Sequence, residues 1–175
     1  VDPASKTRLI DASTAFRVAE GWAYGMAEMS EAHRAQIAAS SRVANPGCYP
    51  QGLIALVRPL IDARIMSADY PVTYNAVSGY SGGGKKMIES YEAAGSTAIP
   101  YLPYGLTFAH KHLPEMQRYA MLAHAPVFQP AVGNYAQGML GAVPVFGELL
   151  VKRATGEAVR DCLAETYDGS PVIEV

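Results

Sequence analysis

The octet Asn-Pro-Gly-Cys-Tyr-Pro-Gln-Gly at residues 45–52 places a cysteine at the start of a predicted helix. Two prolines and two glycines in so short a span predict a sharp turn. Pro50 suits a first helical turn, where its missing N–H leaves no bond unmade. Apolar residues then recur at the spacing of a helix with one buried face, at Leu53, Leu56, Val57, Leu60 and Ile61. Cys48 is therefore expected at the helix N-terminus.

At that position Cys48 has the surroundings of a nucleophile. Free N–H groups and the helix dipole favour an anion at a helix N-terminus, and the thiolate is the nucleophilic form of cysteine. Residues 42–44 predict a short strand before the turn, so the thiol is expected at a strand–turn–helix junction. The alternative is a buried structural cysteine, since free cysteines are among the most buried residues. The turn and the helix start favour the nucleophile.

A glycine-rich loop at residues 78–84 joins a predicted strand at 70–77 to a predicted helix at 85–94. Such a loop can direct backbone N–H groups at a phosphate. The spacing fits Gly-x-x-x-x-Gly-Lys, but Lys86 stands where a phosphate-binding P-loop needs Ser or Thr. The segment therefore does not match a complete nucleotide-binding loop. Its glycines are explained either by anion binding or by close packing.

Two histidines, His110 and His112, follow a short predicted strand at residues 106–108. If the strand continues, both imidazoles point to the same face. Imidazole exchanges protons near neutral pH, so one of the pair is expected to deprotonate Cys48, with Glu115 orienting it. A zinc pair and two surface histidines are the alternatives. No metal site is predicted, because no Cys-x-x-Cys or His-Glu-x-x-His spacing accompanies the pair.

The remaining pattern indicates an α+β fold. Several strands with only a few helices predict a mixed, largely antiparallel sheet with helices packed on one face. Residues 95–103 read as a loop, and Cys162 is expected in the core. Further strands are expected at residues 8–10, 127–130, 139–146 and 171–175, and further helices at 30–39 and 157–166.

Composition excludes several classes of function. At 175 residues and 50% hydrophobic, the chain can bury one sizeable core. The net charge is −2, with 14 Lys and Arg against 16 Asp and Glu, so no basic excess indicates nucleic acid or an anionic membrane as a partner. No apolar run is long enough for a membrane span, and no signal pattern opens the chain. Two cysteines make no disulfide framework, which favours a cytoplasmic protein.

Three motifs in this order resemble the N-acetyl-gamma-glutamyl-phosphate reductase family, in its shorter bacterial form. They are Asn-Pro-Gly-Cys-Tyr-Pro at 45–50, Ala-Val-Ser-Gly-Tyr-Ser-Gly-Gly-Gly-Lys at 76–85 and His-Lys-His-Leu-Pro-Glu at 110–115. The resemblance implies a catalytic domain like that of glyceraldehyde-3-phosphate dehydrogenase, in a homodimer or homotetramer that reduces a small acyl phosphate with NADPH in arginine biosynthesis. Gln51 departs from the family, which commonly has Thr there, and this puts in doubt any first-turn contact of that hydroxyl.

The resemblance also implies roles for individual residues. Cys48 forms a thioester with the substrate, and His110 or His112 handles the protons with Glu115. Substrate or phosphate contacts are implied for Ser78, Gly79, Ser81, Gly82 and Arg17. Cofactor contacts are implied for Ser13, Gly82 and Gly83. For Arg17, a solvated surface position is the alternative.

We expect the chain to be part of a longer protein, since it opens without an initiator Met and closes on a predicted strand with nothing after it. Residues 1–17 are expected to be the edge of a missing Rossmann half that binds most of the NADP(H). Residues 18–175 are expected to form the catalytic and dimerisation domain, without a C-terminal return segment. Three alternatives stay open: a Cys–His acyl hydrolase or transferase that uses no nicotinamide, the lysine-pathway analogue of the reductase, and a non-catalytic interaction domain.

Overall fold

The structure of the chain is a computed structural model that describes residues 7–175. The chain divides into two compact units. The first holds the chain up to Tyr70 together with Lys111–Ala125 and Phe146–Val175. The second holds Pro71–His110 and Pro126–Val145. Residues 1–6 of the segment expected to border a Rossmann half lie outside the described residues.

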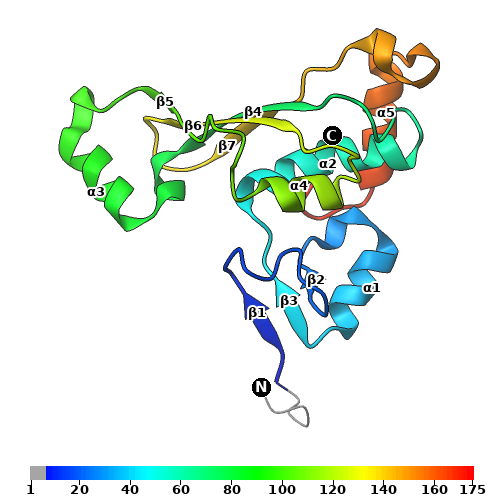
Figure 1. The fold of residues 1–175 in the computed structure, drawn as a ribbon, viewed down its shortest axis with the longest axis horizontal. Helices are drawn as coiled ribbons and strands as arrows, with labels where there is room; N and C mark the ends of the chain where they lie inside the picture. Colours follow the sequence, from blue (N-terminus) through cyan, green and yellow to red (C-terminus); the bar gives the residue numbers. More distant parts are fainter. Residues whose placement is uncertain (1–6) are drawn as a thin grey trace. The chain divides into compact units, whose positions relative to one another are not determined.

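The first unit contains a parallel sheet in the strand order β1-β3-β2 (Figure 1). Strand β3 (Arg42–Ala44) pairs with β1 (Leu9–Asp11) on one side and β2 (Ala23–Tyr24) on the other. Parallel strands end at the same edge of a sheet, and the turns that follow β1 and β3 meet there. The Asn45 N–H donates to the Asp11 carbonyl at 2.7 Å. The Cys48 turn therefore leaves from the carboxyl edge of this sheet.

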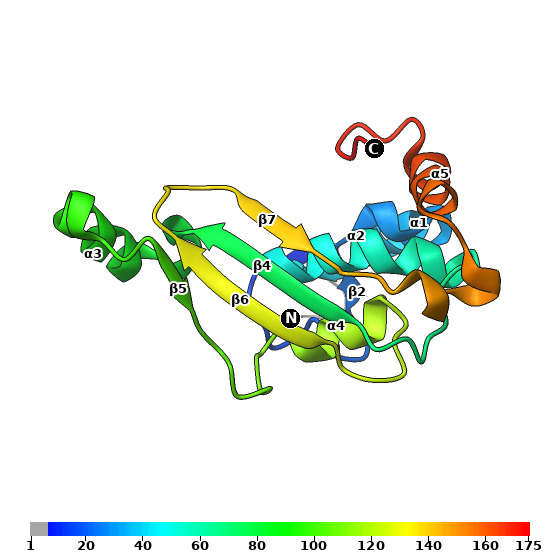
Figure 2. The same ribbon diagram turned by 90° about the horizontal axis from the view of Figure 1, so that it is seen from above.

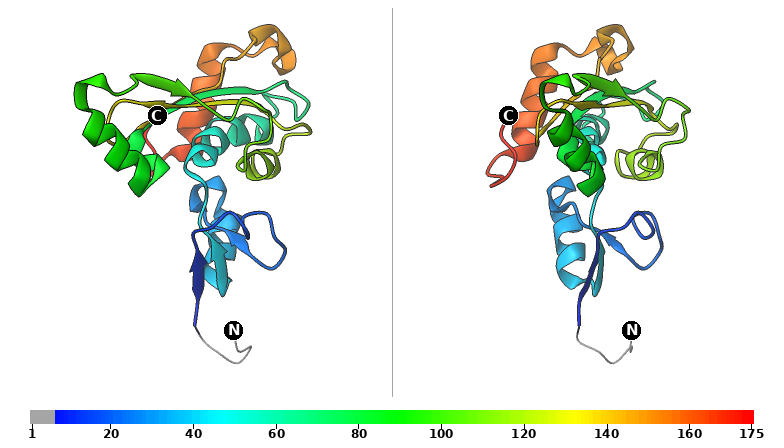
Figure 3. Two further views of the ribbon diagram at one scale, coloured as in Figure 1. Left: turned by 60° about the vertical axis from the view of Figure 1, so that its left-hand side comes forward. Right: turned by 90° about the vertical axis from the view of Figure 1, so that its left-hand side faces the viewer.

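Helix α2 (Cys48–Asp62) is the central helix of the first unit and packs against α4 (Leu113–Tyr119) and α5 (Gly156–Tyr167) (Figures 1 and 3). Its buried stripe follows the predicted period, because Leu53, Val57 and Leu60 are almost completely buried, and Ile54 joins them. Among residues 7–175, no helix is both long and apolar enough to span a membrane. Short 3-10 turns complete the unit at Ala27–Met29, Gly147–Leu149 and Val151–Arg153.

Helix α1 (Glu31–Ala39) begins as the sequence predicts. The Ser30 hydroxyl accepts the backbone N–H of His33 at 3.1 Å, which satisfies one of the free donors of the first turn. The acidic Glu31 in that turn complements the helix dipole.

The second unit contains a mixed sheet in the order β5-β6-β4-β7 (Figure 2). Strand β4 (Thr73–Gly79) runs parallel to β6 (Val127–Gly133) and antiparallel to β7 (Met139–Ala142), and β5 (Tyr101–Pro103) is antiparallel to β6. Helix α3 (Lys85–Ala94) follows the glycine-rich loop and has the predicted bounds. Short 3-10 turns lie at Tyr80–Gly83 and Gly95–Thr97. The predicted mixed sheet with antiparallel pairings is confirmed in this unit.

Several local predictions were wrong. Residues 106–108 form a turn, because Gly105 and Phe108 both have left-handed backbone angles (φ 63° and 56°) that an extended strand excludes. The predicted loop at 95–103 contains β5, and residues 171–175 form no strand. Cys162 is half-buried at the surface of α5 and not in the core.

Candidate active site

Cys48 is the first residue of α2 and is exposed to solvent. The preceding Gly47 is the N-cap residue, with extended backbone angles (φ −68°, ψ 147°). The following Tyr49 and Pro50 are buried, so the thiol stands on a turn that is anchored on both sides. The strand–turn–helix junction predicted from the sequence is confirmed.

The turn before Cys48 is held by the carboxylate of Glu115, which is 2% exposed. Its Oε2 accepts the backbone N–H of Gly47 at 3.0 Å and the hydroxyl of Tyr24 at 2.8 Å. Its Oε1 accepts Nη1 of Arg17 at 2.8 Å in a buried ion pair. Hydrogen bonds to a charged group are roughly twice as strong as neutral ones, so Glu115 is a firm anchor for the start of α2.

Arg17 is buried, so the alternative of a solvated surface arginine is wrong. Its Nε donates to the Asn45 carbonyl at 2.9 Å, in the same turn that Glu115 holds through Gly47. Its own carbonyl accepts the Tyr119 hydroxyl at 2.8 Å. The guanidinium thus clamps the nucleophile turn, and a contact with substrate stays a prediction.

His112 lies beside the same turn. It is buried and immediately precedes α4, and its ring centroid is 6.2 Å from that of Tyr49. A Cβ placed on Gly47 would lie 2.9 Å from His112 Nε2 and 2.6 Å from Glu115 Oε1. Glycine is required at position 47 because these side chains approach its Cα closely. The geometry brings an imidazole to the residue that precedes the candidate nucleophile.

His110 belongs to the second unit. Its ring packs edge-on against the ring of Phe128, with the two centroids 5.0 Å apart. The centroid of the His110 ring is also 5.8 Å from that of Tyr104. The condition for His110 and His112 to share one strand face is not met, because residues 106–112 form no strand. Within the described part of the chain, no three His, Cys, Asp or Glu side chains gather as a metal site would require.

The glycine-rich loop packs tightly against residues 135–138. The backbone N–H groups of Gly79, Tyr80 and Ser81 donate to carbonyls of that segment at 3.0, 3.0 and 3.1 Å. A Cβ on Gly79 would lie 2.7 Å from the backbone there, and the buried Ser78 hydroxyl donates to the Gly79 carbonyl at 3.2 Å. Close packing explains these residues, and fewer amides are left for a phosphate than the sequence indicates.

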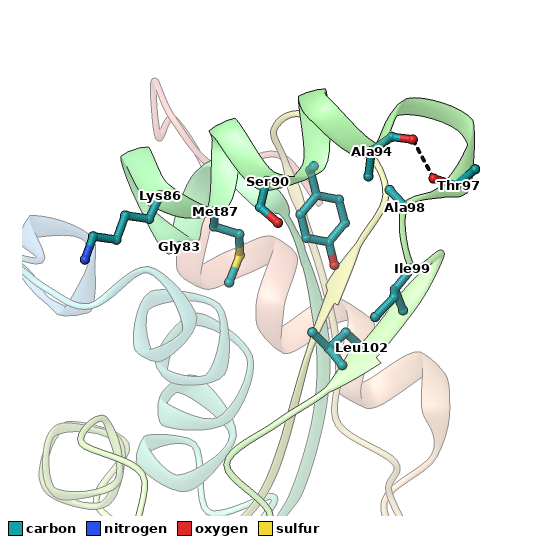
Figure 4. Close-up of a pocket in the computed structure, with 10 residues that line it drawn as sticks. Gly83, Lys86, Met87, Ser90, Ala94, Thr97, Ala98, Ile99 and Leu102 are labelled. Carbon is teal, nitrogen blue, oxygen red and sulfur yellow. Dashed lines mark hydrogen bonds between the residues drawn. The ribbon is translucent and has the colours of Figure 1, made fainter.

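A pocket of about 490 Å³ lies in the second unit between α3 and the segment at residues 97–102 (Figure 4). Met87 lies on the α3 side, and Ile99 and Leu102 lie opposite. Gly83, a predicted cofactor contact, is among its lining residues, and a Cβ there would contact the Met87 side chain. The lining residues include no acid, histidine or cysteine, and Cys48 belongs to the other unit.

Ser13, another of the three predicted cofactor contacts, lies in the exposed turn after β1. Its hydroxyl donates to Asp11 Oδ1 at 2.6 Å. This turn and the Cys48 turn follow neighbouring parallel strands and occupy the same edge of the sheet. The carboxyl edge is where open parallel sheets bind ligands.

Tyr24 is a site residue that the sequence did not reveal. It is 1% exposed, and its ring stacks on Tyr119 with centroids 3.9 Å apart. Burial, reinforced by the carboxylate of Glu115, raises the pKa of Tyr24 above its ordinary value, so the hydroxyl stays protonated and donates. The one available hint is that a buried tyrosine hydroxyl usually has a hydrogen-bond partner.

Comparisons with known proteins agree with one another. The family described as "Semialdehyde dehydrogenase, dimerisation domain" matches residues 48–175. A protein of Chelativorans sp. (strain BNC1) named N-acetyl-gamma-glutamyl-phosphate reductase is 55% identical over 163 residues, which cover 93% of this chain and 53% of that protein. One of the same name from Sinorhizobium medicae (strain WSM419) is 50% identical over 174 residues, covering 98% and 56%. The chain spans about half the length of these relatives.

Among solved structures, the chain is similar to aspartate semialdehyde dehydrogenase II from Vibrio cholerae, with a TM-score of 0.66 and 18% identity over 89% of this chain and 52% of that one. The complex of that enzyme with ASA gives a TM-score of 0.64 at 16% identity, over 94% and 54%. At such identity the likeness concerns the fold alone. It supports the α+β catalytic-domain fold expected from the sequence.

Proposed function

Because the chain belongs to the semialdehyde dehydrogenase dimerisation-domain family, we propose that it is the catalytic half of an NADPH-dependent N-acetyl-gamma-glutamyl-phosphate reductase. The reaction converts N-acetyl-L-glutamyl 5-phosphate to N-acetyl-L-glutamate 5-semialdehyde, a step of arginine biosynthesis. The names of relatives support this activity. The observation in this chain that carries it is an exposed cysteine at the start of α2, on a turn clamped by buried side chains.

In this proposal Cys48 attacks the acyl carbon of the substrate. A C–S bond forms, the bond between that carbon and the phosphate oxygen breaks, and a thioester remains on Cys48. In this proposal, free N–H groups in the first turn of α2 stabilise the transient oxyanion. His112 takes the thiol proton and later exchanges a proton with the substrate oxygen. We assign this role to His112 over His110, because His112 lies beside Gly47 in the same unit as the thiol.

The cofactor part of the proposal rests on the carboxyl edge of the parallel sheet. Ser13 fits a cofactor contact there, because its turn shares that edge with the Cys48 turn. NADPH, when bound, supplies the hydride that reduces the thioester. We propose that residues 1–17 border a Rossmann half, since the relatives are about twice as long as this chain. A contact of Gly82 and Gly83 with the cofactor stays a prediction.

The substrate side of the proposal uses the second unit. Ser78 and Gly79 support the loop more than they bind, because their polar groups are engaged within it. We therefore propose that phosphate contact falls to the Ser81 side chain and to Gly82.

Self-association is the last part of the proposal. The matched family is a dimerisation domain, and both edge strands of the second sheet carry exposed apolar side chains: Tyr101, Leu102, Met139 and Leu140. We propose a cytoplasmic homodimer or homotetramer, which light scattering coupled to size-exclusion chromatography tests. A monomer at micromolar concentration would contradict it.

The activity is tested by mixing the protein with N-acetylglutamyl phosphate in the absence of NADPH and measuring its intact mass. We expect one acyl adduct that maps to Cys48 and is absent in Cys48→Ser but present in the control Cys162→Ser. An adduct that water removes rapidly would indicate an acyl hydrolase. Equal acylation of the substrate analogue longer by one methylene would indicate the lysine-pathway relative. Acylation that persists in Cys48→Ser would overturn the proposal.

A further inference from the structure

We propose that Tyr24 is a positioning residue for Cys48, which acts through the carboxylate of Glu115. The proposal deepens the function above, because it rests on Cys48 as the nucleophile. Tyr24 is 91 residues from Glu115 in sequence, and its hydroxyl donates to Oε2 at 2.8 Å. The same oxygen accepts the N–H of Gly47, the residue before Cys48.

The backbone of Tyr24 is fixed next to the strand that leads to the nucleophile. In the parallel pair β2–β3, Tyr24 lies opposite Ala44, and the N–H of Gly25 donates to the Ala44 carbonyl at 2.9 Å. The chain leaves β3 at Ala44 and reaches Gly47 three residues later. Tyr24 is therefore linked to the nucleophile turn in two ways. Its backbone pairs with β3, which leads into that turn, and its side chain binds Glu115, which also binds Gly47 in the turn.

The hydroxyl of Tyr24 supports the geometry of Glu115. A buried carboxylate needs donors for both of its oxygens, since it has lost its water. Arg17 donates a hydrogen bond to Oε1, and Tyr24 and Gly47 both donate to Oε2. Without the hydroxyl, Oε2 loses one of these two donors. The carboxylate is then expected to rotate or admit water, which loosens Gly47 and with it the first turn of α2.

The substitution Tyr24→Phe isolates this effect. The ring can keep its stack on Tyr119, and the Tyr24 carbonyl keeps its 2.6 Å contact with His33 Nε2, because neither involves the hydroxyl. The matched control is Tyr167→Phe. Tyr167 is also buried, and its hydroxyl donates at 2.7 Å to the carbonyl of Ala55, further along α2. Each variant loses one tyrosine hydroxyl hydrogen bond, buried for Tyr24 and partly buried for Tyr167, but only that of Tyr24 leads to the nucleophile turn.

The test measures the rate of Cys48 acylation by N-acetylglutamyl phosphate, together with the amide NMR signal of Gly47. For Tyr24→Phe we expect the maximal rate to fall roughly 10- to 100-fold, since small misplacements of reacting groups cost that much. The substrate concentration at half-maximal rate is expected to stay within about twofold, because substrate contacts are intact. The Gly47 amide signal should shift. Tyr167→Phe should leave all three readouts near those of the parent protein.

Alkylation of Cys48 by iodoacetamide separates the two proposals, since it needs no substrate. If the parent protein is not acylated, the proposed function fails, while a Gly47 shift with altered alkylation in Tyr24→Phe still supports the positioning role. If Tyr24→Phe is acylated and alkylated at the parent rates with an unmoved Gly47 signal, the positioning role is overturned. Should Tyr24→Phe not fold, Glu115→Asp replaces it, since the shorter carboxylate keeps its charge but withdraws from Gly47. Parent-like rates in that variant would equally overturn the role.

Discussion

The backbone N–H of Gly47 donates to Oε2 of Glu115 at 3.0 Å, across 68 residues of sequence. This bond joins the motif around the candidate nucleophile to the motif that contains His112. Helix α2 has no side-chain cap of its own at its N-terminus. The position of Cys48 is therefore set by a residue of α4, and the two motifs act as one structural element.

Replacement of Gly47 by alanine is expected to destabilise the protein and to abolish acylation of Cys48. The backbone angles of Gly47 suit alanine, so the cost is steric: the new methyl group would meet Glu115 Oε1 at 2.6 Å and His112 Nε2 at 2.9 Å. Overpacking of this kind costs about 1–3 kcal/mol. Urea unfolding measures it, with Gly156→Ala as the control, because a Cβ on Gly156 meets nothing within 4 Å. Equal stabilities of the two variants would contradict the steric argument.

Removal of the Arg17 guanidinium is expected to cost far more than removal of a surface charge. Arg17→Met leaves the Glu115 carboxylate buried without its cation, a change that costs roughly 3–5 kcal/mol. Arg34→Met is the control, because the Arg34–Glu28 pair is 3.5 Å long and Arg34 is 55% exposed, so its loss costs about 1 kcal/mol or less. Chemical denaturation of both variants measures the difference. A loss below about 1 kcal/mol for Arg17→Met would show that the pair is not structural.

The sequence predicted the elements that have a clear local signal. The bounds of α3 and the starts of α1 and α2 follow from glycine, serine and proline at fixed offsets. The sequence also predicted that α2 is a helix with one buried face, because its apolar residues recur with the helical period. Helix α4 was not predicted, because its seven residues are too few to establish a period.

The network around Glu115 could not be predicted in the same way. Its members come from segments separated by 68, 91 and 98 residues, and no pattern within one segment indicates the others. Arg17 alone was consistent with a surface residue, and no pattern in the sequence singled out Tyr24. Only the folded structure, in which β2, the turn after β3 and α4 lie together, shows that Arg17, Tyr24 and Gly47 all bind the carboxylate of Glu115.

The two cysteines are expected to differ in their reaction with iodoacetamide at pH 8. Cys48 is exposed at the helix start, while Cys162 is half-buried, and burial raises the pKa of the Cys162 thiol above its usual value. Less Cys162 thiolate is present at that pH, so Cys48 should be labelled faster. Peptide mapping after short labelling times measures both rates. Faster labelling of Cys162 would contradict the assignment of Cys48 as the accessible nucleophile.

Stability is expected to fall in alkaline solution as buried tyrosines ionise on unfolding. Burial, with a smaller contribution from Glu28, raises the pKa of Tyr167 to about 12, whereas an unfolded tyrosine titrates near about 10. Between these values the unfolded chain releases a proton that the folded chain retains. The contribution of Tyr167 is therefore complete below pH ~10 and is lost as the pH rises towards 12, at about 1.4 kcal/mol per pH unit. Burial also raises the pKa values of Tyr24 and Tyr119, so Tyr167→Phe should remove only the share of the slope that Tyr167 contributes. Unfolding measurements at pH 9, 10 and 11 test this, and a slope equal to that of the parent protein would contradict it.

His112 and His110 are expected to have separable roles. His112→Asn removes the imidazole beside Gly47 and should slow acylation of Cys48 by about 10²–10⁴-fold, the usual contribution of a general base. His110→Asn removes a ring packed on Phe128 in the second unit, so it should lower stability and leave the acylation rate of the folded protein within a few fold. The pH dependence of acylation tests the assignment further, because only His112→Asn should change the shape of the pH–rate profile. If His110→Asn changes that profile instead, His110 is the base, and the turn beside Gly47 has no proton acceptor of its own.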